Sequence, residues 1–373
     1  MKMRKWLFRT AAALVATVLF LSGVSAAPQV CASCAILIDA DTGRILYADN
    51  ANQESLIAST TKIMTAVVVL EHCDLKTVYE IPPEATGVEG SSVYLKPGEK
   101  LTIEELLYCM MLQSGNDAAV ALALACSDSV PEFVDLMNLK AQELSLHQTH
   151  FENPNGLDGE NHHSSAADLA HLTQYALQNP TFEKIVSTKT ITIGHRHLSN
   201  HNRLLWSLDG TIGVKTGYTR AAGRILVSAA ERNGRRLIAV TINDGNDWND
   251  HALLYEYGFS QYDDQILIRE GEEVGWVELA DGTRATLTAA VDISYAACEN
   301  EEVRVAILSP RYAFCAGLPG RPAGSAAVYI GKRRIGFLPL NWGEQEEAHA
   351  GTTAKNIICP RPYLPARCGK AAF

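Results

Sequence analysis

Two features are scarce in this sequence of 373 residues, and each absence excludes a class of protein. No block of basic residues follows the first few positions, and the formal net charge is −10. A nucleic-acid-binding surface needs clustered lysine and arginine, so we expect no nucleic acid partner. After residue 27 no apolar run reaches the roughly 18–20 residues of a membrane-spanning helix. We therefore expect no transmembrane segment beyond the N-terminal region.

Paired cysteines with the spacing of a zinc site are also missing. Cys31-x-x-Cys34 stands alone, whereas a structural zinc site needs a second pair at a matching interval, so we expect no metal and no other cofactor. The odd number of cysteines leaves at least one thiol unpaired: Cys31, Cys34, Cys73, Cys109, Cys126, Cys298, Cys315, Cys359 and Cys368. The last four could form two disulfides. Cys109 and Cys126 lie in apolar helical runs and are expected to be small core residues.

The features that are present begin with a targeting segment over residues 1–27. Basic residues at the start, the apolar run AAALVATVLFLSGV and small residues ending at Ala26 follow one another in the order of a signal peptide. A retained N-terminal anchor is the alternative, although the apolar run is shorter than a membrane span prefers. We expect the protein to be exported and to work outside the cytoplasm, in the cell envelope or secreted.

The remaining chain predicts two domains of ordinary globular composition, with 47% hydrophobic and 20% charged residues. Strand patterns at both ends of residues 28–263 enclose helical patterns, among them 58–72, 131–147, 164–178 and a helix opened by a capping box at Thr102-x-x-Glu105. This order predicts an α+β domain in which an antiparallel sheet pairs its terminal strands and is covered by a helical region. A further strand is expected over 186–194. Residues 264–373 alternate short β-type runs with glycine and charged turns, which predicts a small β-rich C-terminal domain.

The first chemical motif is in the stretch IASTTKIMTA, where Ser59 precedes Lys62 by three residues. Residues i and i+3 share one face of a helix, so the two side chains can come within hydrogen-bond distance. Burial or a nearby cation lowers the pKa of a lysine and makes it a base, and a helix N-terminus favours negative charge developing on the serine. A surface capping serine is the alternative.

Two more motifs follow along the chain. Ser114-Gly115-Asn116 interrupts two helical patterns, and a turn there can present a hydroxyl that relays a proton and an amide that holds a carbonyl or the lysine. Lys215-Thr216-Gly217 lies in a predicted edge strand, where a glycine lets another backbone approach and a peptide can add as a strand. Lysine and threonine could then receive a C-terminal carboxylate. A helix N-cap and an exposed charged strand are the respective alternatives.

The three motifs together resemble those of the penicillin-binding proteins. From about residue 34 to 262 the chain is similar to the low-molecular-mass members that are serine-type D-alanyl-D-alanine carboxypeptidases, peptidase family S11. The likeness is carried by the blocks IDADTGRILYADNAN, ASTTKIMTA, SSVYLKPGEKLTIEELLYCMMLQSGNDAAVALA, NPNGLDGENHHSSAADLA and GVKTGYTRAAGRILVSAAERNGRRLIAV. It implies a penicillin-binding protein/β-lactamase-like catalytic domain, with residues 264–373 in the place of the family's C-terminal domain.

The resemblance implies three catalytic residues. Ser59 would be the nucleophile that attacks the D-Ala-D-Ala peptide carbonyl, Lys62 would be its base, and Ser114 would pass the proton to the leaving D-alanine. Water would then hydrolyse the acyl-enzyme. The implied partners are peptidoglycan stem peptides ending in D-Ala-D-Ala and, as covalent inhibitors, β-lactam antibiotics that mimic them.

The resemblance also implies a set of substrate-binding residues. Asn116 would orient the lysine and the substrate, and Lys215 and Thr216 would hold the substrate carboxylate. Beside Gly217, the backbone N–H of Tyr218 would form the oxyanion hole together with that of the serine nucleophile.

The chain departs from the family at three places. In NHNRLLW the basic position between the asparagines is His201, with Arg203 nearby, and an arginine of some members is replaced around Asp250 in NDWNDH. The tail CPRPYLPARCGKAAF contains three prolines and cannot form the family's amphipathic C-terminal helix. Any peripheral contact with the membrane or cell wall must therefore arise in another way.

Three other functions are compatible with parts of the pattern. A class A β-lactamase needs a glutamate that positions the deacylating water, and Glu152 and Glu160 lie in the corresponding region without the β-lactamase pattern. A metal peptidase could use His195, His197 and His201, although no acidic partner has a telling spacing. A non-catalytic penicillin-binding scaffold would not need all three motifs intact.

Overall fold

The computed structural model describes residues 27–297, 301–310 and 312–346. The predicted signal peptide and the proline-containing tail lie outside the described residues. The chain divides into two compact units between Gln261 and Tyr262, and each is described by itself. The sequence placed this division after residue 263.

The first unit is built on a five-stranded sheet in the order β2-β1-β9-β8-β7, in which every pairing is antiparallel. Its strands are β1 (Cys34–Asp39), β2 (Ile45–Asp49), β7 (Thr211–Thr219), β8 (Gly223–Arg232) and β9 (Arg235–Ile242). The strand nearest the N-terminus, β1, pairs with β9 from the end of the unit. The predicted pairing of terminal strands is thus confirmed, and β7 is left as an edge strand.

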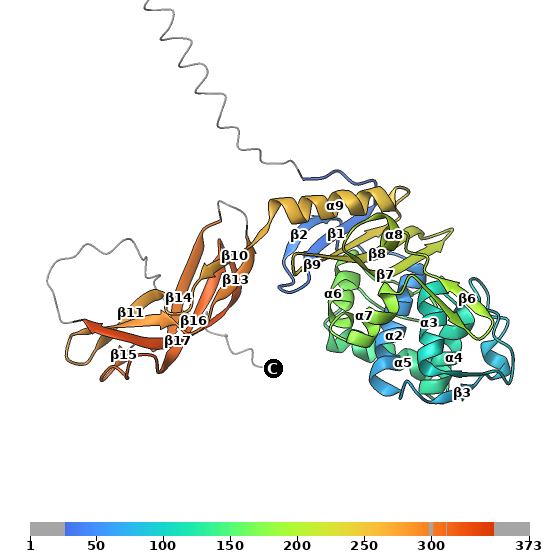
Figure 1. The fold of residues 1–373 in the computed structure, drawn as a ribbon, viewed down its shortest axis with the longest axis horizontal. Coiled ribbons are helices and arrows are strands. Elements are labelled where there is room, and N and C mark those ends of the chain that lie inside the picture. The colour runs from blue at the N-terminus through green and yellow to red at the C-terminus, as the bar shows by residue number, and fades with distance from the viewer. Residues whose placement is uncertain (1–26, 298–300, 311, 347–373) are drawn as a thin grey trace, which may run out of the picture. The chain divides into compact units, whose positions relative to one another are not determined.

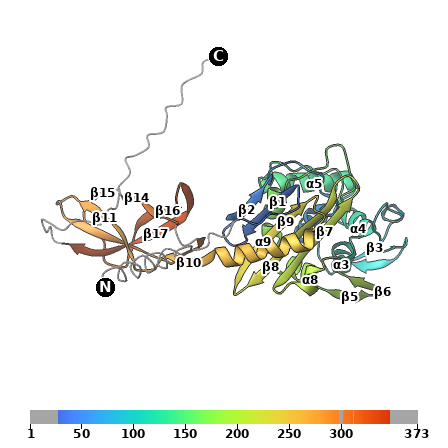
Figure 2. The ribbon, with the colours of Figure 1, turned by 90° about the horizontal axis from the view of Figure 1, so that it is seen from above.

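Both faces of this sheet are covered by helices. Because successive side chains of a strand point to opposite faces, each strand contributes side chains to both layers. Ile36 and Val240 belong to one core with the helices of the middle of the chain. On the other face lies α9 (Asp247–Gln261), whose Gly258 is so close to the sheet that a Cβ there would lie 2.7 Å from both Leu37 and Leu237. Figure 1 shows α9 along one side of the sheet and α2 to α7 on the other, and Figure 2, seen from above, shows α9 crossing in front of the strands.

The helical region contains α2 (Lys62–His72), α3 (Ile103–Gln113), α4 (Asn116–Cys126), α5 (Val130–Glu143), α6 (Ala166–Ala176), α7 (Pro180–Ser187) and α8 (Leu204–Ser207). The short strands β3 (Val78–Glu80), β4 (Lys100–Thr102), β5 (Thr190–Ile193) and β6 (Arg196–Ser199) and the 3-10 turn η2 (Pro83–Ala85) complete the unit. The capping box predicted for α3 is present, since Thr102 and Glu105 each accept a hydrogen bond from the other's backbone N–H, at 2.7 and 3.2 Å. It fixes where α3 starts, and the helix ends at Ser114, which adopts the left-handed conformation.

Two predicted elements differ in detail. The helix expected over 58–72 begins with a separate 3-10 turn, η1 (Ala58–Thr61), before α2. The strand expected from Val186 starts only at Thr190, because Asn179 caps α7 and that helix extends to Ser187. A polar N-cap followed by proline at the first helical position favours a helix. The helix then includes Val186 and Ser187, although these residues also fit a β-type pattern.

The second unit is β-rich, as predicted. A six-stranded sheet in the order β14-β16-β17-β12-β11-β15 encloses a core of its own that includes Leu287, Val328 and Leu338. Its strands are β11 (Glu273–Leu279), β12 (Arg284–Ala289), β14 (Val303–Ser309), β15 (Tyr312–Ala313), β16 (Pro322–Ile330) and β17 (Arg333–Glu346), with β10 (Asp263–Ile268) and β13 (Ile293–Ala297) as a separate pair. Among the described residues of both units, none of the helices combines the length and apolarity needed to cross a membrane.

The cysteines correct one expectation. Cys126, expected in the core, forms a disulfide with Cys73, which links the C-terminal ends of α2 and α4. Cys109 is buried with a free thiol, as expected of a core residue. Cys315 also has a free thiol, against its predicted pairing, and the other three cysteines of the last quarter lie outside the described residues.

Candidate active site

The serine and lysine of the first motif meet as predicted. Ser59 lies in η1, and Lys62 is the first residue of α2. The Lys62 Nζ is 3.0 Å from the Ser59 Oγ. The turn is tight because Ala58 has a φ of +45°, in the left-handed region, and the hydroxyls of the two threonines of the motif bond to backbone carbonyls within the turn.

The surroundings of Lys62 disfavour its charged form. The side chain is fully buried, and its Nζ also donates to the Asn116 Oδ1 at 2.7 Å and to the Asn155 backbone carbonyl. Burial, reinforced by the charge of Lys215, holds the pKa of Lys62 well below its usual value, although Asp117 acts in the opposite direction. The lysine is therefore poised to accept a proton.

The second motif forms the turn between α3 and α4. Ser114 ends α3 in the left-handed conformation with a φ of +59°, and its buried hydroxyl has no hydrogen-bond partner among the described residues. Asn116 starts α4, and its Nδ2 donates to the Glu89 carbonyl while its Oδ1 accepts from the lysine. The turn thus orients the amide toward Lys62 and leaves a hydroxyl free for another partner.

The third motif lies on the edge strand β7. Lys215 is 2% exposed, and its Nζ donates to the Thr216 carbonyl at 3.0 Å. Burial lowers the pKa of Lys215 from 10.5 to about 7. Thr216 is half-buried and lines the same pocket as the serine of the first motif.

Gly217 makes the close approach between β7 and the serine turn possible. A Cβ at this residue would lie 3.1 Å from the Ile57 carbonyl oxygen and 3.3 Å from the Ser59 nitrogen. The sequence predicted that this glycine lets the backbone of a bound peptide approach. In the structure the backbone that it lies against is that of the protein's own serine turn. Tyr218 follows immediately, with its side chain 65% exposed on the rim.

A loop that the sequence analysis did not assign to the site, residues 152–162, packs against the serine turn. Gly156, with a φ of +86°, lies so close that a Cβ would overlap the Ala58 carbonyl group. The buried His162 accepts the Glu152 backbone N–H at its Nδ1 and faces the Thr61 hydroxyl with its Nε2 at 2.7 Å. This contact pattern defines a neutral imidazole with its proton on Nε2, and burial lowers the pKa of His162 to about 4.

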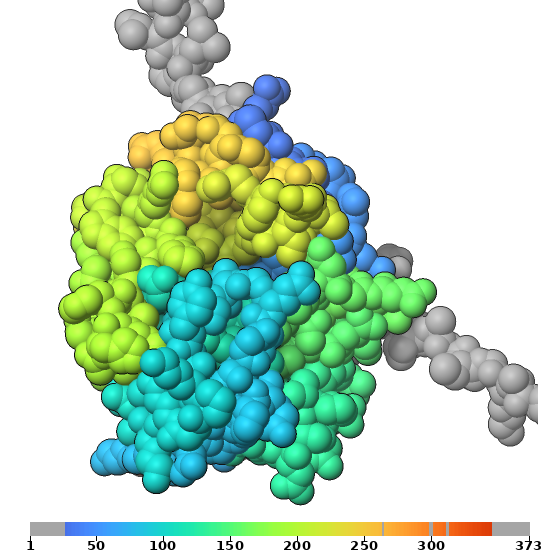
Figure 3. All heavy atoms as spheres, turned by 90° about the vertical axis from the view of Figure 1, so that its right-hand side faces the viewer, coloured from blue at the N-terminus to red at the C-terminus, as the bar shows by residue number. Residues whose placement is uncertain are grey.

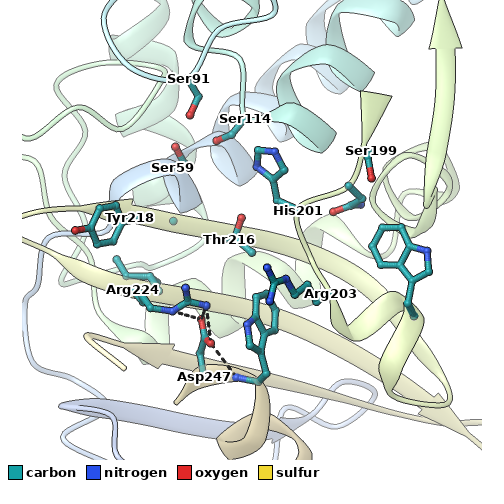
Figure 4. Close-up of a pocket in the computed structure, with 15 residues that line it drawn as sticks. Ser59, Ser91, Ser114, Ser199, His201, Arg203, Thr216, Tyr218, Arg224 and Asp247 are labelled. Carbon is teal, nitrogen blue, oxygen red and sulfur yellow. Dashed lines mark hydrogen bonds and ion pairs between the residues drawn. The ribbon is translucent and has the colours of Figure 1, made fainter. Parts of the chain in front are cut away.

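Side chains from all three motifs open into one pocket of about 600 Å³. Figure 4 shows Ser59 and Ser114 facing each other across its upper wall, with Thr216 on the strand below them. The hollow is visible in Figure 3 between the blue-cyan part of the helical region and the yellow-green strands. Lys62, Asn116 and Lys215 lie beneath this surface, fully or almost fully buried.

The pocket also has walls that the motifs did not reveal. They include Arg203, Trp206, Arg224, Asp247 and Trp248. The Arg224 guanidinium donates three hydrogen bonds of 2.7, 2.8 and 3.1 Å to the Asp247 carboxylate, shown as dashed lines in Figure 4. Only a three-dimensional fold brings these residues together, because the arginine is in β8 and the aspartate is at the start of α9.

Of the residues at which the chain departs from the family pattern, one lines the pocket and another does not. His201 lines the pocket, and burial together with the charge of Lys215 lowers its pKa. Asp250, identified as the residue in place of an arginine, is instead buried and accepts hydrogen bonds from the Cys31 N–H and the Asn246 Nδ2, while Asp247 is the residue that lines the pocket. Within the described part of the chain, the histidines, cysteines and acidic residues form no cluster that could hold a metal ion.

A serine held against a buried lysine, beside the edge strand of an antiparallel sheet flanked by helices, defines a serine peptidase of the penicillin-binding class. Comparison with solved structures gives the same class. Penicillin binding protein 5 from Haemophilus influenzae is similar with a TM-score of 0.72 and 28% identity, over 87% of this chain and 99% of that one. A mutant of the Streptomyces K15 DD-transpeptidase has a TM-score of 0.61 and 33% identity, over 62% of this chain and 99% of that one.

Sequence comparison identifies the family within this class. A family model described as D-alanyl-D-alanine carboxypeptidase, peptidase family S11, matches residues 22–246. D-alanyl-D-alanine carboxypeptidase DacF of Bacillus subtilis is 36% identical over 264 residues, 67% of this chain and 68% of DacF. DacB2 of Mycobacterium tuberculosis is 36% identical over 239 residues, 60% of this chain and 81% of DacB2. The chain belongs to the S11 family of D-alanyl-D-alanine carboxypeptidases, and is therefore a serine peptidase of the hydrolase class.

Proposed function

We propose that this protein removes the terminal D-alanine from peptidoglycan stem pentapeptides through an acyl-enzyme on Ser59, and that β-lactams acylate the same serine. The observation that carries the proposal is the contact between Ser59 and a fully buried Lys62 whose pKa is held low. Such a lysine can take the serine proton at neutral pH, which an ordinary exposed lysine cannot.

The hydrogen bonds around the lysine agree with a neutral amine. A neutral amine has two N–H groups and one lone pair. The Asn116 Oδ1 and the Asn155 carbonyl can accept the two N–H groups, so the lone pair faces the Ser59 hydroxyl. Lys62 is in this way positioned as the base for attack on the peptide carbonyl.

Ser114 is proposed to carry the proton onward to the departing D-alanine. Its hydroxyl is buried, lines the pocket and has no hydrogen-bond partner within the described part of the chain, so it can bond to the leaving amine. Proton transfer by a positioned group typically contributes about 10²–10⁴-fold to a rate. Water then hydrolyses the ester on Ser59 and releases the shortened peptide.

β7 is proposed to bind the substrate as an added strand. It is the edge of the sheet, a Cβ at its Gly217 would lie 3.3 Å from the Ser59 nitrogen, and Tyr218 is the next residue of the strand. These two donors would form the oxyanion hole. Lys215 and the Thr216 hydroxyl would receive the terminal carboxylate, whose negative charge would favour the protonated form of the lysine.

The place of action is proposed to lie outside the cytoplasm. The support comes from residues 1–27, which have the order of a signal peptide, and from the substrate class, because cell-wall stem peptides are extracytoplasmic. Any contact with the membrane or wall surface would be peripheral.

Mass spectrometry of the mature protein after brief exposure to penicillin tests the mechanism. We expect a penicilloyl adduct on the peptide that contains Ser59, lasting for minutes, and release of D-alanine from a D-Ala-D-Ala stem peptide. Ser59→Ala should abolish both, and Lys62→Ala should nearly do so, with unchanged far-UV circular dichroism as the check of folding.

The other outcomes identify the alternatives. An unmodified protein with destroyed penicillin would indicate a β-lactamase, whereas an unmodified protein with intact penicillin would indicate a scaffold. Continued D-alanine release by the Ser59→Ala variant would refute the proposed nucleophile.

A further inference from the structure

The pocket extends beyond the residues proposed to hold the substrate carboxylate. Its far end is walled by Arg203 and Trp206, neither of which belongs to the three motifs. Arg224, which pairs with Tyr218 in the register of β7 and β8, and Trp248 line the pocket as well. A pocket of about 600 Å³ is within the range of roughly 300–1,000 Å³ in which proteins bind drug-sized ligands.

The geometry of β7 identifies which part of a substrate lies at this end, given the function proposed above. Lys215 and Thr216 precede Tyr218 along the strand, so the residue that leaves lies toward the start of β7. The Asn202 Nδ2 donates to the Gly213 carbonyl at 2.7 Å, which attaches the segment before α8 to that part of the strand. Arg203 and α8 therefore flank the leaving residue, and Figure 4 shows Arg203 on the far side of Thr216 from Tyr218.

Trp206 presents an apolar surface to this part of the pocket. Leu204 and Leu205 are buried and hold α8 against the domain, while the Trp206 side chain remains 50% exposed at the wall. Indole rings give large contact area with few rotatable bonds, and aromatic pairs add about 0.5–1.5 kcal/mol beyond the area that they bury.

The two arginines differ in their charge environment. Arg224 is bonded to the almost fully buried Asp247, and its guanidinium lies 5.5 Å from the centre of the Trp248 ring. Arg203 is exposed, and among the described residues its guanidinium has no ion pair or hydrogen bond. A guanidinium without a charged partner can stack on one face of a bound aromatic ring while the indole of Trp206 contacts the ring from another side.

We propose that this end of the pocket is a subsite for an aromatic side chain on the C-terminal residue, so that the enzyme hydrolyses D-Ala-D-X bonds in which X is aromatic as well as D-alanine. The chemistry is unchanged. The Ser59 oxygen bonds to the D-alanine carbonyl carbon as the C–N bond to X breaks, X leaves as its free amine with the transferred proton, and water cleaves the ester.

The test is a comparison of kcat/KM for the full mature enzyme on peptides that differ only in X, with X as D-Ala, D-Leu or D-Phe, measured as free X released. We expect D-Phe to be released at least as efficiently as D-Leu and within about tenfold of D-Ala. Trp206→Ala should lower the ratio of D-Phe to D-Ala at least tenfold, a change of about 1.4 kcal/mol, and Trp206→Phe should largely restore it. Trp276→Ala, which removes a similarly exposed tryptophan of the second unit, should leave the ratio unchanged.

The outcomes separate this inference from the proposed function. If D-Ala is released but D-Phe is released more than a hundredfold less efficiently, or if Trp206→Ala lowers both rates equally, the aromatic subsite is wrong and the carboxypeptidase stands. If no peptide is cleaved and penicillin leaves Ser59 unmodified, the proposed function fails and the subsite fails with it.

Discussion

A single methyl group added at Gly156 should displace the serine turn. Gly156 has a φ of +86°, and its missing Cβ would overlap the Ala58 carbonyl and lie 3.0 Å from the Ser59 nitrogen. Unbonded carbon and oxygen atoms prefer roughly 3.5 Å, so one of the two backbones must move by on the order of 1 Å. Misplacement of a reacting group by about 1 Å can lower a rate by about 10²-fold. We expect Gly156→Ala to slow acylation of Ser59 by about that factor.

Gly87→Ala is the matched control. Gly87 also has a positive φ, +69°, but nothing lies within 4 Å of where its Cβ would be. Both variants should lose about 1–2 kcal/mol of unfolding free energy from the left-handed backbone conformation alone. Only Gly156→Ala should lose acylation rate.

The assay is the rate of penicilloyl adduct formation by intact-protein mass spectrometry, together with urea unfolding of each variant. Acylation of a folded Gly156→Ala protein at the wild-type rate would show that the loop does not position the serine. An equal loss of rate in both variants would assign the effect to general destabilisation.

The remaining predictions concern three other parts of the domain. The pKa of His162 is about 4 in the folded state and about 6.5 when unfolded, so the unfolded state binds the proton first and stability should fall by about 2 kcal/mol as pH drops from 7 to 4.5; His162→Gln should flatten this part of the urea-unfolding profile. Reduction of Cys73–Cys126, whose separation is 53 residues, should lower the unfolding free energy by about 4 kcal/mol on the chain-entropy model, measured with and without reductant. Ser114→Ala should slow D-alanine release by about 10²-fold or more while changing stability by under about 0.5 kcal/mol, because the hydroxyl bonds to none of the residues that the structure describes; a large stability loss would contradict this.

Local sequence patterns predicted the parts of the site that depend on local geometry. The interval between Ser59 and Lys62 is enough to bring their side chains together, since residues one helical turn apart share a face. The order of strands and helices was enough to predict that the terminal strands of the domain pair. The first conclusion uses only neighbouring residues, and the second uses only the order of elements along the domain.

Three of the missed features depend on contacts between distant segments. The Asn155 carbonyl on Lys62 comes from a loop about ninety residues further along the chain, and backbone atoms have no signature in a sequence. The ion pair of Arg224 and Asp247 joins a strand to a helix whose relative placement follows only from packing. Cys126 has the apolar neighbours of a core residue, and its partner is set by how α2 lies against α4.

The last prediction concerns the buried Lys215, because burying its amino group lowers the unfolding free energy of the domain. Its pKa of about 7 in the folded state, against 10.5, means that the unfolded chain takes up the proton first as pH falls. Stability is therefore lost between about pH 10.5 and 7, and the lysine should destabilise the domain at pH 7 by about 4 kcal/mol. Lys215→Met keeps a long unbranched side chain without the charge.

We expect Lys215→Met to raise the unfolding free energy at pH 7 by a few kcal/mol and to weaken binding of the D-Ala-D-Ala carboxylate. The gain should shrink as the pH of the urea titration rises past 10.5, above which lysine is neutral in both states. A variant that is less stable than the wild type at pH 7 would show that the hydrogen bond to the Thr216 carbonyl outweighs burial of the charge. A gain that persists at high pH would instead assign it to apolar packing.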